Sequence, residues 1–196
     1  MNNFDPSNYG EVEGLIILKA IPKDKCLDDD IAYEFGDICG VIRVYLGQEK
    51  DADGETTLVT IKPTLDALTD WNVSKEELFN IACENNKAIF GFVLTDAPFL
   101  DDAYVILSKL FINGAAFVLD PSVREYVRKE VQDDYYICFL SVHEAVIHPK
   151  HTVDDVNALQ EALNYMIESG ATTSDVFLTA KVYEYSNGEF KMVSDS

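Results

Sequence analysis

Three histidines and a glutamate in the second half of the chain are the residue types best suited to chemistry. His143, Glu144, His148 and His151 lie within nine residues. Imidazole and carboxylate groups are ligands that zinc takes in catalytic sites. One hypothesis is therefore a small metal-assisted hydrolase that uses the region of His143, Glu144 and His148, with His151 as a further ligand.

The spacing of these residues argues against a ready-made metal site. The helical H-E-x-x-H motif places its histidines four residues apart on one face, whereas His143 and His148 are five apart. On a strand the two rings would point to opposite faces, because side chains alternate. A shared ion would need a bend near Ile147. The pattern favours structural roles, with His143 or Glu144 bonded to nearby backbone and with His148 and His151 in a loop.

Other familiar active-site patterns match the sequence poorly. Ser141 lies two residues before His143 and could share a strand face with it, but no G-x-S-x-G elbow surrounds the serine. The acidic segment from Asp51 has its glycine, Gly54, at the fourth position, whereas a calcium-binding EF-hand loop needs it at the sixth. The sequence contains neither a Walker loop nor a dinucleotide-binding glycine fingerprint. No cofactor is expected.

Two of the three arginines stand four residues apart, so they share a face if the segment is helical. Arg124 and Arg128 could clamp a carboxylate or phosphate through their planar guanidinium groups. A simpler interpretation is a solvated helix face on which they pair with Glu125 or Glu130.

The charge of the chain is its broadest signal. Thirty-five acidic and fifteen basic residues give a formal net charge of −20. That excess argues against direct binding to nucleic acid, whose phosphates need lysine and arginine, and against anionic membranes. It favours a protein partner with a basic surface. If the acids share one face, they could imitate a phosphate track; the candidate binding residues are Asp28, Asp29, Asp30, Asp51, Asp53, Asp101, Asp102, Asp133 and Asp134.

Four cysteines are spread along the chain without a C-x-x-C pair. Reduced thiols and a cytoplasmic location are the simplest interpretation. Residues 1–11 are mostly polar and predict a loose leader. They contain neither the basic nor the apolar region of a signal peptide.

The candidate histidines follow a central unit, residues 113–149, that we expect to fold as strand, helix, strand and strand. The apolar run 115–119 predicts a strand buried on both faces. Asp120 and Pro121 suit the cap and first position of a helix. Residues 135–142 are rich in aromatic and branched side chains and predict a strand, which residues 143–148 continue or pair with.

The remaining elements complete the fold class. A capping box at Ser74 and Glu77 starts one helix, and the acids after Thr152 start another that ends near Gly170. Apolar segments predict strands at residues 12–21, 41–46, 56–61, 89–95 and 103–112, and a hairpin at residues 182–193. We therefore expect a single α+β domain over residues 12–196, with a mostly antiparallel sheet and about three to four helices packed on it.

The order of these pieces resembles an uncharacterised bacterial family, the domain of unknown function 5688. The resemblance runs through VIRVYL, WNVSKEELFNIACEN, FVLT, NGAAFVLDPSVREYV, DDYYICFLSVHEAVIHP and VYEYSNGEF, over roughly residues 12–193. Phe139 and Leu140 stand where the family pattern has Leu-Pro. The resemblance implies the fold but carries no activity to this chain.

The sequence therefore favours a non-enzymatic, acidic protein-binding module with a basic partner. Its sharper form is a nucleic-acid mimic that inhibits an enzyme acting on nucleic acid.

Overall fold

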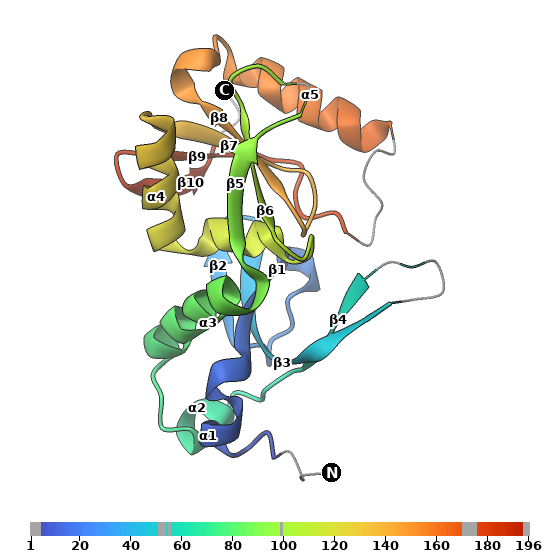
Figure 1. The fold of residues 1–196 in the computed structure, drawn as a ribbon, viewed down its shortest axis with the longest axis vertical. Coiled ribbons are helices and arrows are strands. Elements are labelled where there is room, and N and C mark those ends of the chain that lie inside the picture. Colours follow the sequence, from blue (N-terminus) through green and yellow to red (C-terminus); the bar gives the residue numbers. More distant parts are fainter. Residues whose placement is uncertain (1–4, 51–53, 55, 99, 170–175, 194–196) are drawn as a thin grey trace.

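Ten strands in the described part of the chain form two antiparallel sheets, so the expected α+β class is confirmed (Figure 1). The structure is a computed structural model that describes residues 5–50, 54, 56–98, 100–169 and 176–193. The first sheet contains β1 (Ile16–Pro22), β2 (Ala32–Phe35), β3 (Ile38–Lys50) and β4 (Thr56–Ile61). The second contains β5 (Phe92–Asp96), β6 (Tyr104–Ser108), β7 (Tyr135–Phe139), β8 (Ala145–Pro149), β9 (Val182–Ser186) and β10 (Glu189–Met192).

The strand orders differ from the order of the sequence. In the first sheet β3 lies between β1 and β2, and its far end pairs with β4; in the second the order is β10-β9-β7-β8-β6-β5. Among the described strands, β2 pairs with β3 alone and is therefore an edge strand. β7 and β8 occupy the centre of the second sheet, which explains why their residues are mostly buried.

Two helices begin at the capping residues that the sequence predicts. Ser74 and Glu77 form the full capping box of α3, and the Asp120 carboxylate accepts a backbone amide at the start of α4. The helix expected to start after Thr152 begins later, at Val156, and Asp155 is its cap rather than part of its first turn. The α-helices are α1 (Tyr9–Val12), α2 (Ala67–Asp70), α3 (Lys75–Phe90), α4 (Pro121–Val131) and α5 (Val156–Glu168). The 3₁₀ helices are η1 (Glu13–Leu15), η2 (Lys23–Lys25), η3 (Gly114–Leu119) and η4 (Lys150–Thr152).

The predicted strand at residues 115–119 is wrong, because this run is part of η3. All six residues of η3 are buried, and they contact β1 of the first sheet and β6 and β8 of the second. A strand offers side chains to two faces only, whereas a helix can face several neighbours at once. An apolar run without a clear period cannot distinguish these cases.

Several predicted boundaries also shift. The strand expected over residues 12–21 begins at Ile16, and the leader becomes helical at Tyr9. The strand expected over residues 103–112 ends at Ser108. The one expected through residues 143–148 begins at Ala145, after a bend over residues 141–143. The helix expected to end near Gly170 has its last described turn at Glu168, and Gly170 lies outside the described residues.

A partly buried polar cluster joins the two sheets. The Tyr183 hydroxyl of β9 donates to the Asp37 carboxylate, and it lies 2.7 Å from the carbonyl oxygen of Phe35. The Thr179 hydroxyl donates to the other Asp37 oxygen at 2.6 Å. These bonds fix the turn between β2 and β3 against the second sheet, and so they fix the orientation of the β2 edge.

No helix within the described part of the chain is long and apolar enough to cross a bilayer.

Candidate functional site

His143 joins the bend after β7 to the start of η3. The His143 Nδ1 accepts a hydrogen bond from the Asn113 backbone N–H at 3.2 Å. The backbone N–H of His143 donates to the Ser141 hydroxyl at 3.0 Å. The His143 carbonyl lies so close to Gly114 that a Cβ there would sit 2.1 Å from its oxygen. The prediction that His143 bonds to nearby backbone is confirmed. The Ser141 hydroxyl accepts the backbone N–H of His143. A serine nucleophile would instead contact a nitrogen of the imidazole ring that acts as its base.

The other two histidines lie in different elements. His148 belongs to β8, opposite Tyr136, so its predicted place in a loop is wrong. Burial lowers the pKa of His148. His151 is exposed in η4, and its Nδ1 lies 2.8 Å from the Asp133 carboxylate. The three imidazole rings therefore lie in different elements and have different neighbours.

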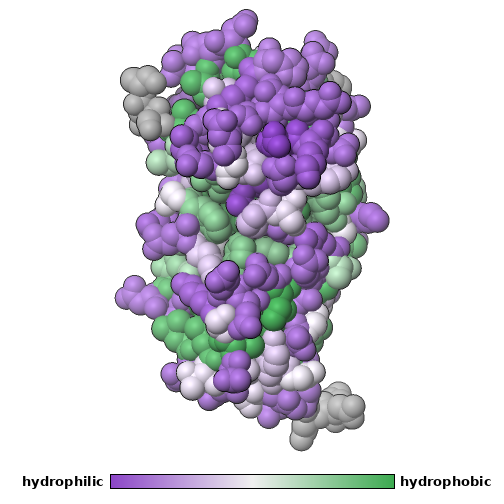
Figure 2. Space-filling model, turned by 90° about the vertical axis from the view of Figure 1, so that its left-hand side faces the viewer, coloured by the Kyte–Doolittle hydropathy of each residue, from purple (hydrophilic) through white to green (hydrophobic). Residues whose placement is uncertain are grey.

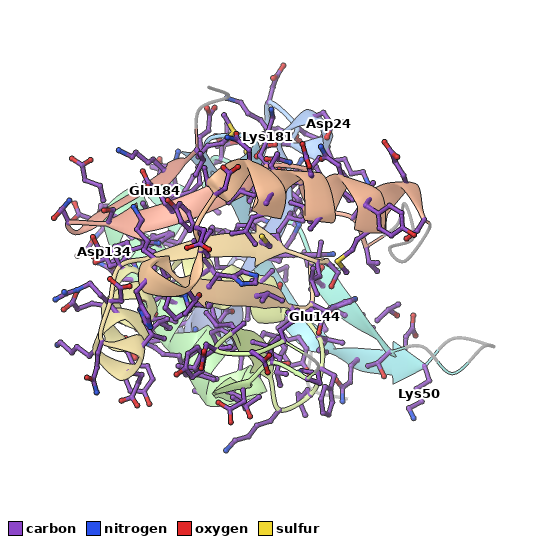
Figure 3. All side chains as sticks on the ribbon, turned by 90° about the horizontal axis from the view of Figure 1, so that it is seen from above. Asp24, Lys50, Asp134, Glu144, Lys181 and Glu184 are labelled. Carbon is purple, nitrogen blue, oxygen red and sulfur yellow. The ribbon has the colours of Figure 1, made fainter. Side chains whose placement is uncertain are left out.

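No set of three or more His, Cys, Asp or Glu side chains among the described residues is grouped so that it could hold a metal ion. Figure 3 shows the spread of these groups: Glu144, at the start of β8, lies at the opposite end of the central strands from Asp134, at the start of β7.

The acidic segment before β2 is partly neutralised by local bases. The Asp30 side chain is buried, with its carboxylate 2.8 Å from Arg43 and 3.5 Å from Lys62, and Lys62 also pairs with Asp29. Burial alone would raise the pKa of Asp30, but the Leu27 amide, Arg43 and Lys62 together hold it below its usual value. The buried Asp30 therefore forms an ion pair with Arg43, while Asp28 is exposed.

The acids before β7 also make local bonds. Asp133 accepts the backbone N–H of His151 at 2.8 Å, and Asp134 accepts the Ser186 hydroxyl at 2.7 Å. Asp101 and Asp102 are exposed between β5 and β6. Asp51 and Asp53 lie outside the described residues.

The prediction of a solvated helix face is wrong for Arg124 and confirmed for Arg128. Arg124 is only 9% exposed, and it donates to the Val118 carbonyl at 2.8 Å. Its guanidinium lies over the ring of Phe190, with its Cζ 4.7 Å from the ring centroid. Arg128 bonds the Glu125 carboxylate at 3.1 Å. Arg124 therefore holds α4 against η3 and β10 rather than binding a ligand.

Sequence reasoning missed a groove of about 650 Å³ beside β2. All four residues of β2 line it, together with the start of α3 and the entry to α4. Its apolar wall includes Tyr33, Phe35, Phe79 and Leu119. The Tyr33 and Phe79 ring centroids are 4.7 Å apart. Hereafter this feature is called the β2 groove.

The β2 groove lies on the side of the molecule that carries α3 and α4. Figure 2 shows this side, where apolar residues are exposed at mid-height and again in the lower part, among mostly polar surfaces. The groove walls come from segments far apart in the sequence. The alternating Tyr33 and Phe35 were the one sequence signal for it, because such alternation on a short strand places two aromatic side chains on one face.

A family model, described as a family of unknown function (DUF5688), matches residues 96–187. The matched region runs from the end of β5 to the end of β9 and includes η3 and α4. No curated protein and no solved structure matches the chain.

Proposed function

We propose that this chain, whose residues 96–187 match the model of a family of unknown function (DUF5688), is a non-enzymatic, acidic protein-binding module whose partner has a basic surface. The observation that carries the proposal is the net charge of −20. Such a charge raises the rate of encounter with basic partners and repels acidic ones.

The candidate catalytic residues support this proposal over the hydrolase. His143 joins the β7–β8 bend to Asn113, and His151 pairs with Asp133. His148 lies opposite Tyr136 within the second sheet. Each histidine therefore has a place in the fold that explains its presence without a catalytic role. The metal-assisted hydrolase has no grouped ligand set among the described residues in its favour.

The finer hypothesis of nucleic-acid mimicry rests on the charge alone. Of the candidate acids that the structure describes, Asp29, Asp30, Asp133 and Asp134 are already engaged in local bonds. Mimicry would draw on the exposed acids, and competition would test it. If the partner binds this protein through the groove in which the partner binds nucleic acid, added duplex DNA should displace it. If the partner binds through another surface, it should stay bound, which would contradict mimicry.

The four cysteines are free, three of them buried. This supports the proposal of a reducing, cytoplasmic location.

Capture from a lysate of the native host tests the proposed function. The immobilised chain should retain a basic protein at roughly 50 mM salt and release most of it at roughly 500 mM, because salt screens exposed charges. A second acidic protein of similar net charge is the control for simple ion exchange. Retention of no protein beyond those that bind the control contradicts the proposal.

A further inference from the structure

We infer that the β2 groove binds an extended, lysine- or arginine-containing segment of the partner, which adds to the first sheet as a strand beside β2. The inference rests on the proposed function and specifies where and how the partner is recognised.

The β2 edge presents unpaired backbone groups. The Ile42 N–H donates to the Ile31 carbonyl at 2.9 Å, so this opposed pair is hydrogen-bonded. The register continues with Tyr33 opposite Gly40. In an antiparallel ladder such pairs alternate with residues whose backbone groups point away from the partner strand. The N–H and C=O groups of Ala32 and Glu34 therefore point to the open edge, where no described strand pairs with them.

Exposed edges of this kind accept extended peptides, whose affinity comes from the backbone and whose specificity comes from alternate side chains. Every second side chain of an added strand would point toward α3. There it would meet the Tyr33 and Phe79 rings and the exposed Pro121 at the entry to α4. The inferred segment therefore alternates apolar side chains with others that face solvent.

The charges beside the groove indicate the character of those other side chains. Glu34 and Glu76 are exposed and line it, and so does Lys75, whose ammonium lies 5.0 Å from the centroid of the Tyr33 ring. The attraction for a cationic segment therefore comes from the two glutamates together with the net charge of −20 of the chain. Glu34 pairs with Lys23 at 2.5 Å, and that pair is exposed on both sides. A lysine or arginine of the partner can exchange for Lys23 at little cost, because exposed ion pairs contribute little.

A second copy of this chain is a poorer occupant. Each copy carries a net charge of −20, so pairing two β2 edges would bring two strongly acidic molecules together. A basic segment gains from the same field.

Selection from a phage-displayed library of random peptides, each about ten residues long, tests the inference. Enriched sequences should alternate apolar residues with lysine or arginine. A synthetic peptide of the enriched sequence is then titrated by fluorescence anisotropy against the wild type and two variants. Ala32→Pro removes an edge N–H and leaves the pairing with β3, and Phe79→Arg places a cation in the apolar wall. Each should weaken binding by about tenfold or more.

Tyr165→Arg is the matched control, because it changes an exposed aromatic residue to the same cation on a different helix, α5. Its affinity should stay within about twofold of the wild type. Amide exchange should also slow at Ala32 and Glu34 when the peptide binds.

Failure of the inference differs from failure of the proposed function. The inference that the β2 groove binds a peptide is contradicted if the selection enriches no peptide. It is also contradicted if the enriched peptide binds the wild type, Ala32→Pro and Phe79→Arg equally well. Self-association of the wild type that Ala32→Pro abolishes would make a second copy the occupant and also overturns it. If both variants still capture the basic partner from lysate in a salt-dependent way, the proposed function stands and the docking site lies elsewhere.

Discussion

Gly114→Ala should be among the most damaging single-methyl additions to the described part of this protein, and it tests the structural interpretation of the histidine segment. The added Cβ would lie 2.1 Å from the His143 carbonyl oxygen and 2.9 Å from the Leu107 Cα. Both neighbours are backbone, so a side-chain rotation cannot relieve the overlap. The bend at residues 141–143 must move away from η3 by about 1 Å.

That movement breaks identified contacts. The bond from the Asn113 N–H to the His143 Nδ1 and the bond from the Ala115 N–H to the Val142 carbonyl both cross the same junction. Overpacking costs about 1–3 kcal/mol, and each lost bond costs about 1 kcal/mol more. The expected loss in the free energy of unfolding is therefore about 3–5 kcal/mol. It should lower Tm by roughly 10 °C for a chain of this length.

Urea unfolding followed by the fluorescence of the single tryptophan, Trp71, measures this loss. Gly14→Ala is the matched control, because a Cβ there meets no atom within 4 Å. Its stability should stay within about 0.5 kcal/mol of the wild type. If Gly114→Ala does not fold, its loss from the soluble fraction beside a folded Gly14→Ala gives the same answer. A Gly114→Ala variant as stable as the control would refute the close contact and the structural role assigned to the bend.

Three further measurements test local features. Ser74→Ala removes the capping box of α3 and should cost about 1 kcal/mol in urea unfolding, and equal stability would contradict the cap. Asp30→Asn weakens the charged contact with Arg43 and should cost about 2 kcal/mol at pH 7. Because the folded pKa of Asp30 is depressed, its contribution is present above the unfolded pKa of about 3.9 and is lost as pH falls below it. The gap between the variant and the wild type should therefore shrink at pH 3, and a constant gap would contradict the pairing. Burial raises the pKa of Cys138 to about 12, so iodoacetamide at pH 8 should label the partly exposed Cys26 first. Mass spectrometry measures the labelling, and faster labelling of Cys138 would contradict its burial.

The features that could be predicted from sequence are those fixed by a few neighbouring residues. The Ser74 box and the Asp120 cap depend on side chains that bond backbone within three residues, so their positions are correct. The hairpin of β9 and β10 is likewise set by its Asn187-Gly188 turn, where both residues have positive φ.

The features that could not be predicted depend on contacts between distant segments. The run at residues 115–119 forms η3 because it fills the space between two sheets, which its apolar composition does not reveal. Arg124 is buried because the rings of Tyr185 and Phe190 cover it, some sixty residues further along the chain.

The candidate site shows the same limit. The acids were found as clusters, but the neutralisation of Asp30 needs Arg43 and Lys62 from other strands and loops. The β2 groove is formed where β2, the start of α3 and the entry of α4 lie close together, and no pattern of neighbouring residues predicts this arrangement.

The salt dependence of affinity for the captured partner tests the central claim most directly. Titration by fluorescence anisotropy from roughly 50 to 500 mM salt should weaken binding by about tenfold or more, chiefly through a slower association rate. An affinity that stays constant over this range would contradict a function that works through the acidic charge of this protein.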